Sequence, residues 1–339
     1  MTNVKTTQTM AFPGTRHRSP AWKRWLSVQA YGLVTRSLFP AHGSPLAMRA
    51  RFERFARTPR EKLSRKYPEL VFEDYSFGDR GMEAVRAVDA PSCVLMHLHG
   101  GAYFMGTPAS YRSRTMRLSY RCNAEVFAPG YRLAPEHPAP AALDDALDAW
   151  CELRRLRPRV PMFVSGDSAG GGLAISMMVA LREQGLPLPD GAVLFSPWTD
   201  LSVSGASYED NDRSDVWLSR AHCERWAGYY LGDVDPRDPR VSPMYANLQG
   251  LPPMLLLVGD REVLFDDARQ VHEHALAAGV ESTLHVGRHM QHDWPLTLPW
   301  LDESRDAWSS IAAFAARFSG SEKDHPCVPR GQKSAVPER

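Results

Sequence analysis

Residues 164–176 read VSGDSAGGGLAIS and set Ser168 among small residues directly after an apolar run. The run MFVSG predicts a strand, and the stretch GGLAISMMVALREQ after it predicts a helix. Gly166, Ser168 and Gly170 fit the G-x-S-x-G pattern of a tight strand-to-helix turn, which needs small side chains because neighbouring backbone comes close. Such a turn raises the Ser168 hydroxyl at the end of the strand and aims the first helix N–H groups, including that of Ala169, at an anion beside it. The alternative is a glycine-rich loop that only packs the helix on the strand.

Short apolar runs alternate with helical stretches on both sides of this turn. The runs are VFEDYSF, MEAVRAV, CVLMHLH, EVFAPGY, MFVSG, AVLFSPW, MLLLVG and STLHV. The helical stretches between them include ALDDALDAWCELRRL, ARQVHEHALAA and DAWSSIAAFAARF. This alternation predicts an α/β fold with a mostly parallel central sheet flanked by helices on both faces.

The rhythm of strands and helices is interrupted in the middle of the chain and at its ends. Residues 20–66 carry only helical periodicity, and residues 200–235 form a polar, aromatic stretch that predicts a helical insertion. The main α/β domain is therefore expected to span 67–319, with the insertion inside it. Residues 1–19 and 320–339 are expected to be disordered.

The N-terminal helical segment has an unusual charge. Residues 1–66 contain 14 Lys and Arg but only 2 Glu, whereas the rest of the chain contains 26 basic and 37 acidic residues. Trp22, Leu26, Ala30, Leu33, Val34 and Leu38 fall on one helical face, so we expect this helix to lie on the rest of the protein. We favour a solvated helical layer on an acidic body, and attraction to an anionic surface or substrate is the alternative.

Composition excludes several classes of protein. The chain has 339 residues, of which 43% are hydrophobic, and this is enough for a substantial core. Its five cysteines show no CxxC pair and no partner histidines at metal-ligand spacing, so we expect reduced thiols and no metal. No signal peptide, no run of 18 apolar residues and no nucleotide-binding glycine motif occurs. These features predict a cytoplasmic protein with no transmembrane segment and no nucleic-acid partner.

A second glycine motif follows an earlier strand. His99-Gly100-Gly101-Ala102 comes directly after the run CVLMHLH. The N–H groups of Gly101 and Ala102, with Gly100 as a further candidate, are placed to bind the same oxygen as Ala169. Two independent sets of donors suit an oxyanion hole for a tetrahedral intermediate. The alternative is an ordinary glycine turn.

A serine nucleophile needs a base and an orienting acid, which are expected after later strands. Four carboxylates follow MLLLVG. Two of them, at positions 266 and 267, suit the start of a helix, so Asp260 and Glu262 remain as candidates for the acid. His289 and His292 follow the run STLHVG and are both candidates for the base.

The motifs HGGAYFMG, YRLAPEHPAPAALDDA, GDSAGGGLA, SPWTDL and GRHMQHDWPL resemble those of the bacterial hormone-sensitive lipase-like esterases of the α/β-hydrolase superfamily. The resemblance covers residues 60–318 and implies an α/β-hydrolase fold with a helical cap. It selects Glu262, two residues before a leucine, and His292, two residues before an aromatic residue. Two departures from the family pattern are Ala102, where HGGG is usual, and a glutamate where the acid is usually aspartate.

The resemblance implies a serine carboxylic-ester hydrolase for short- to medium-chain acyl esters, with no metal or cofactor. Candidate substrate-binding residues are Tyr103, Asp167, Trp217 and Leu218, and the alternative for the aromatic ones is packing of the cap on the body. A deacetylase, lactonase or amidase of a small metabolite would use the same residues, and a non-catalytic ligand-binding protein is a further alternative. The expected partner is a small-molecule ester, and a homodimer stays open.

Overall fold

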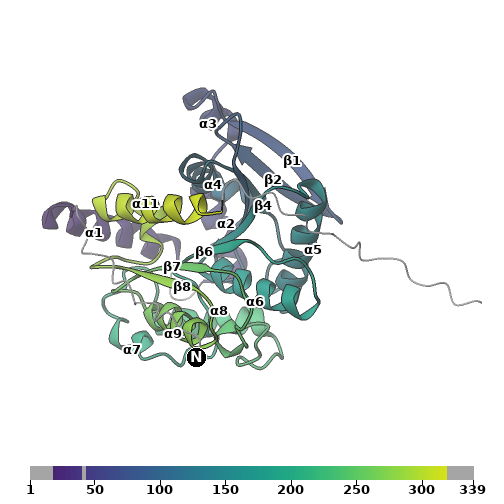
Figure 1. The fold of residues 1–339 in the computed structure, drawn as a ribbon. Coiled ribbons are helices and arrows are strands. Elements are labelled where there is room, and N and C mark those ends of the chain that lie inside the picture. Colours follow the sequence, from purple (N-terminus) through teal and green to yellow (C-terminus); the bar gives the residue numbers. More distant parts are fainter. Residues whose placement is uncertain (1–17, 40–42, 319–339) are drawn as a thin grey trace, which may run out of the picture.

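A computed structural model describes residues 18–39 and 43–318, which form one sheet with helices on both sides (Figure 1). The strands are β1 (Val71–Phe77), β2 (Arg80–Arg86), β3 (Cys93–Leu98), β4 (Ala124–Pro129), β5 (Met162–Asp167), β6 (Gly191–Phe195), β7 (Met254–Gly259) and β8 (Ser282–Gly287). Their order in the sheet is β1-β2-β4-β3-β5-β6-β7-β8. β2 pairs antiparallel with β1 and β4, and all other neighbours are parallel. The predicted mostly parallel α/β sheet is confirmed.

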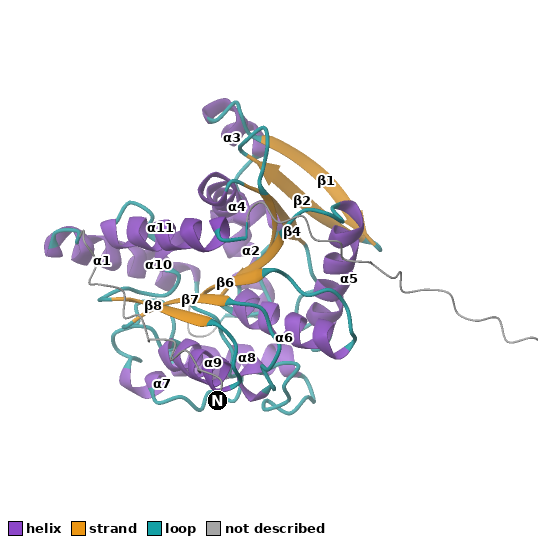
Figure 2. Ribbon diagram, viewed as in Figure 1, coloured by secondary structure: helices purple, strands orange, loops and turns teal. Residues whose placement is uncertain are grey.

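Both faces of the sheet are apolar because helices cover both (Figure 2). The helices of this layer structure are α4 (Pro108–Cys122), α5 (Ala141–Leu156), α6 (Ala169–Glu183), α9 (Phe265–Ala277), α10 (Trp294–Thr297) and α11 (Asp302–Ala316). Alternate strand residues enter two cores: Leu95 packs on the side of α4 and α11, whereas Met96 packs on the side of α5, α6 and α9. Because both faces of each central strand are buried, successive residues of these strands must be apolar, and the apolar runs in the sequence meet this requirement.

Additional helices lie outside these two layers. They are α1 (Ala21–Leu38), α2 (Pro45–Ala56) and α3 (Arg60–Lys66) before the sheet, α7 (Ser207–Asp210) and α8 (Arg220–Leu231) in the insertion, and the 3₁₀ turn η1 (Pro243–Tyr245). We call α1, α2 and residues 200–235 the cap. Among the described residues, no helix is both long and apolar enough to cross a membrane.

The expected face of α1 is covered only at its C-terminal end, where Val34 and Leu38 are half-buried and Leu38 packs on the core. The side chains of Trp22, Leu26 and Leu33 are 66%, 51% and 71% exposed. The helix instead buries Val28 and Thr35 on its other side. Periodicity identified the helix, but apolar residues occur on both of its faces, so the pattern alone did not decide which face is covered.

The expected disordered ends, 1–19 and 320–339, lie outside the described residues except for positions 18 and 19. Ser19 is buried, and its hydroxyl oxygen accepts a hydrogen bond from the Asp302 N–H (2.9 Å). No disulfide joins the four cysteines of the described chain. The fifth, Cys327, is outside the described residues.

The turn between β5 and α6 depends on a close approach of backbone. A Cβ atom added at Gly170 would lie 2.1 Å from the Leu98 carbonyl oxygen at the end of β3. Only glycine permits this distance. The start of α6 therefore lies directly against the end of the strand that precedes the HGGA motif, and the two glycine motifs meet at one edge of the sheet.

Candidate active site

Ser168 lies in the turn between β5 and α6, with a backbone conformation (φ 53°, ψ −122°) that is strained for a non-glycine residue. Its N–H donates to the Phe195 carbonyl oxygen at the end of β6 (2.8 Å), and its own carbonyl oxygen accepts from the Trp198 N–H (2.9 Å). These bonds hold the turn in the conformation that the G-x-S-x-G pattern predicts. The serine is 8% exposed, at the edge of a cavity.

The structure brings His292 and Glu262 together. His292 follows β8 and Glu262 follows β7, and the histidine Nδ1 lies 2.9 Å from the glutamate Oε2. Both side chains are buried. Nε2 of His292 has no hydrogen-bond partner within the described residues, and His292 lines the same cavity as Ser168.

Glu262 is fixed by the ends of two further strands. Its Oε1 accepts hydrogen bonds from the Ser196 hydroxyl, which follows β6 (2.8 Å), and from the Gly259 N–H at the end of β7. The Ser196 oxygen in turn accepts from the N–H of Asp293 (3.1 Å), the residue after the histidine. Ser196 was not predicted, although it begins the SPWTDL motif at the carboxyl end of a strand.

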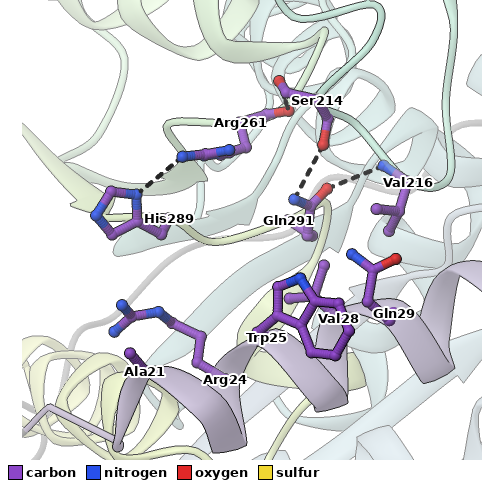
Figure 3. A pocket seen from close by; sticks show the side chains of 10 residues that line it. All are labelled: Ala21, Arg24, Trp25, Val28, Gln29, Ser214, Val216, Arg261, His289 and Gln291. Atoms are coloured by element: carbon purple, nitrogen blue, oxygen red, sulfur yellow. Dashed lines mark hydrogen bonds between the residues drawn. The ribbon is translucent and has the colours of Figure 1, made fainter.

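The competing candidates for acid and base lie elsewhere. Asp260 accepts a hydrogen bond from the N–H of His289 (2.6 Å), and Nδ1 of His289 lies 3.3 Å from an Arg261 nitrogen. His289 and Arg261 line a separate cavity of about 430 Å³ beside α1 (Figure 3). His292 lines the cavity with Ser168 and pairs with Glu262, whereas Asp260 pairs with the backbone of His289, which lines the other cavity, so the geometry favours Glu262 and His292.

The HGGA loop places two N–H groups next to the serine. Gly101 has φ 112° and Ala102 has φ 51°, which is a left-handed conformation that costs alanine roughly 1–2 kcal/mol. Within the described part of the chain, no acceptor binds the N–H groups of Gly101, Ala102 and Ala169. All three residues are at the Ser168 turn or line the cavity there, so they form a candidate oxyanion hole.

Gly100 is not available as an oxyanion donor. Its N–H donates to Oδ1 of Asp167 (3.0 Å). Asp167 lines the cavity, and its carboxylate is also bound by protein groups: Oδ2 accepts from the Tyr111 hydroxyl (2.9 Å) and Nε2 of His97 lies 3.2 Å from Oδ1. The carboxylate thus joins the serine turn to the HGGA loop.

The cavity beside Ser168 is small, at about 20 Å³. Trp217 and Leu218 line it, as expected, whereas Tyr103 does not, because its ring stacks on Tyr230 with the centroids 3.8 Å apart. The Trp217 ring lies edge-on to the His292 ring at 5.0 Å. The insertion of the cap therefore forms one wall of the site.

One buried carboxylate connects this wall to the acid. Asp215 Oδ1 accepts from the N–H groups of Trp217 and Leu218, both at 2.9 Å, and Oδ2 accepts from the Val263 N–H (3.1 Å), next to Glu262. Burial raises the pKa of Asp215 to about 6. Sequence reasoning did not identify this residue, because its partners are backbone groups in a distant loop.

Carboxylates surround His292. Burial alone lowers the pKa of His292, but the charges of Asp293, Glu262 and Asp215 outweigh burial and raise the pKa to about 9. Oδ2 of Asp293 lies 3.5 Å from Nε2 of His292, on the side away from Glu262, and burial also raises the pKa of Asp293. The imidazolium form is therefore favoured in the resting site.

No group of three or more His, Cys, Asp and Glu side chains within residues 18–39 and 43–318 is arranged to hold a metal ion. Catalysis by the groups described above requires none. A buried serine, an imidazole paired with a carboxylate and three N–H groups together suit acyl transfer.

Comparisons with known proteins agree with this geometry. Residues 95–296 match the family described as alpha/beta hydrolase fold. An acetyl-hydrolase of Streptomyces hygroscopicus is 41% identical over 70% of this chain and 80% of that protein. An ethyl acetate hydrolase of Pseudomonas putida is 33% identical over 59% of this chain and 65% of that protein. A solved esterase of the bacterial hormone-sensitive lipase family superposes with a TM-score of 0.79 at 32% identity, covering 89% of this chain and 100% of that one.

The chain belongs to the α/β-hydrolase family and, within it, to the hormone-sensitive lipase-like esterases. It is a carboxylic ester hydrolase. The resemblance on which the sequence prediction relied is confirmed.

The carboxylates around His292 predict an unusual pH dependence. His292 must be neutral to accept a proton, so kcat/KM for p-nitrophenyl acetate should rise with pH through a midpoint near 9. In Asp293→Asn the midpoint should move to lower pH, because one negative charge beside the imidazolium is lost. Asparagine tolerates the left-handed conformation at this position (φ 55°). An unchanged midpoint in this variant, corrected for spontaneous hydrolysis, would show that Asp293 does not set the pKa.

Ser196 should act as a positioning residue. Ser196→Ala removes the hydroxyl that joins Glu262 to the loop of His292, and kcat should fall about 10- to 100-fold with little change in KM. Ser119→Ala is the matched control, because that buried hydroxyl binds Ala87 N–H and the Ala124 carbonyl far from the site. Equal kcat values for both variants, at equal folded fraction by circular dichroism, would contradict the role of Ser196.

Proposed function

We propose that Ser168, His292 and Glu262 are the catalytic triad of an esterase for acetyl and other short-chain acyl esters. The observation that carries this proposal is the buried His292–Glu262 hydrogen bond at the wall of the cavity that contains Ser168. Three N–H groups without a protein acceptor at the same cavity support it. A non-catalytic binding protein would have no need of this combination.

In the first half of the reaction, Oγ of Ser168 attacks the carbonyl carbon of the ester. Its proton passes to Nε2 of His292 while Nδ1 stays hydrogen-bonded to Glu262, which stabilises the imidazolium. The carbonyl oxygen becomes an oxyanion that the N–H groups of Gly101, Ala102 and Ala169 bind. The imidazolium then gives its proton to the alcohol oxygen as the bond from carbon to that oxygen breaks, and the acyl group stays on Ser168.

In the second half, water replaces the alcohol. His292 takes a proton from the water, whose oxygen attacks the acyl carbon, and the same N–H groups bind the second oxyanion. The bond to Ser168 Oγ breaks as Oγ recovers a proton from His292. The products are one alcohol and one carboxylic acid, and the residues return to their starting state.

The size of the cavity supports a short acyl group. About 20 Å³ is little more than the roughly 10–15 Å³ that a cavity needs to hold one water molecule. Trp198, Trp217 and Trp226 surround this space, and all three lie on or beside the insertion. A long acyl chain would need these rings to move. The two relatives named for hydrolysis of acetyl groups and ethyl acetate point the same way.

The triad is tested with single substitutions assayed on p-nitrophenyl acetate. Ser168→Ala and Glu262→Gln should each lower kcat by about 10³-fold or more. The first variant lacks the nucleophile, and the second lacks the negative charge that stabilises the imidazolium of His292. Asp260→Asn is the matched control for the acid, since its carboxylate contacts His289 instead of His292, and it should keep most of the activity. Loss of activity in Asp260→Asn with retention in Glu262→Gln would reassign the acid.

The acyl preference is tested with p-nitrophenyl esters from acetyl to dodecanoyl. We expect kcat/KM to be highest for acetyl to butyryl and to fall by about tenfold or more by octanoyl, because the cavity cannot hold the longer chain. Matching acetanilides and small lactones in the same series separate esterase from amidase and lactonase activity. A maximum at decanoyl or dodecanoyl would contradict the proposed short-chain preference.

A further inference from the structure

Helix α1 exposes a continuous apolar stripe. Trp22, Trp25, Leu26 and Leu33 are 66%, 61%, 51% and 71% exposed. Their spacings of three, four, seven and eleven residues place them on one side of the helix. The opposite side already packs on the protein through Val28, so the stripe has no partner within the described chain.

Two further exposed apolar side chains lie beside an adjoining side of α1. Phe55 of α2 and Trp300 after α10 are 62% and 53% exposed, and both line a cavity of about 460 Å³ beside α1. Trp300 is tied to α1, because its Nε1 donates to the Ser27 hydroxyl oxygen (3.0 Å) and its carbonyl oxygen accepts from Lys23. We call Trp22, Trp25, Leu26, Leu33, Phe55 and Trp300 the outer cap face.

This face contains most of the large apolar surface that the described residues expose. Six of the ten large hydrophobic side chains that are strongly exposed there belong to it. Single exposed apolar residues are normal on proteins, but a cluster with four aromatic side chains marks an interaction surface. In Figure 1, α1 lies beside α11 at the edge of the molecule.

The surroundings of the outer cap face are basic. Between positions 18 and 57 there are eight Lys and Arg residues and one acidic residue, Glu53. Two of the arginines pair with carboxylates of the body, Arg24 with Glu303 and Arg49 with Glu136. The side chains of Arg36, Arg51, Arg54 and Arg57 are exposed, and none of them forms an ion pair within the described residues.

The charge decides between the two obvious occupants. A second copy of the chain on a two-fold axis would bring one basic rim against the other, and like charges in contact are unfavourable. An anionic lipid surface has the complementary charge. Tryptophan and leucine on one side of a helix with Lys and Arg around it are the features of helices that lie in the interface of a bilayer.

We propose that the outer cap face docks this esterase on the surface of membranes that contain anionic phospholipid. The apolar rings enter the interface, and the exposed arginines bind the phosphate groups. This docking does not depend on the catalytic roles proposed above. It accounts for the exposed face of α1 and for the excess of basic residues in one segment of the chain.

The test is co-sedimentation of the full chain with vesicles of phosphatidylcholine, with and without phosphatidylglycerol. Ser168→Ala protein is used so that no lipid is hydrolysed. We expect binding to the vesicles with phosphatidylglycerol, weakened by salt. The combined variant Trp22→Ser, Trp25→Ser, Leu33→Ser should bind about tenfold or more weakly. Val286→Ser, at an exposed apolar residue of β8, is the matched control and should bind like the parent.

Two further measurements make the outcome decisive. The combined variant with Ser168 intact should keep its activity on p-nitrophenyl acetate and its melting curve, which shows that it is folded. Light scattering should give the same mass for the parent and the variant. Absence of vesicle binding by the parent, equal binding by the combined variant, or a parent dimer that the variant converts to a monomer would each overturn the proposal.

Discussion

The carboxylate of Glu262 is held by the ends of three neighbouring parallel strands. Ser196 after β6, Gly259 at the end of β7 and His292 after β8 all donate to it. These groups meet because parallel strands end at the same edge of a sheet, where chain segments far apart in sequence come together. Asp167 does the same for the other half of the site, where it joins the serine turn to the HGGA loop through Gly100. Two buried carboxylates thus organise both halves of the candidate active site.

The fold could be predicted from sequence because it depends on local patterns, and the strand ends limited the candidate acid and base to a few residues, among which only the family resemblance selected Glu262 and His292. Apolar runs between helical stretches predict the parallel sheet, and the order serine, acid, histidine follows from the strand ends. The structural roles of residues that act through contacts distant in sequence could not be found in this way. Ser196 binds a side chain 66 positions away, and Asp167 binds an N–H group 67 positions away. The sequence pattern also could not predict which side of α1 packs on the protein, because both sides of this helix carry apolar residues.

The cap links the basic N-terminal segment to the site in two ways. Arg49 of α2 donates to the Phe104 carbonyl oxygen beside the HGGA loop (2.7 Å) and pairs with Glu136. Tyr31 of α1 lies edge-on to Trp217 at 5.8 Å, and Trp217 contacts His292. One side of α1 and α2 thus packs on the body of the protein, as expected for a basic helical layer. Their other side is exposed, and it is the surface for which we infer a lipid partner.

The central claim is that Ser168 is the nucleophile, and covalent labelling tests it most directly. The folded protein is treated with a dye-labelled fluorophosphonate, digested, and analysed by mass spectrometry beside His292→Ala protein. A single adduct on the peptide that contains Ser168, formed rapidly in the parent and slowly without the histidine, is the result we predict. A rapid adduct on another residue, or no adduct on protein that hydrolyses p-nitrophenyl acetate, would contradict the assignment.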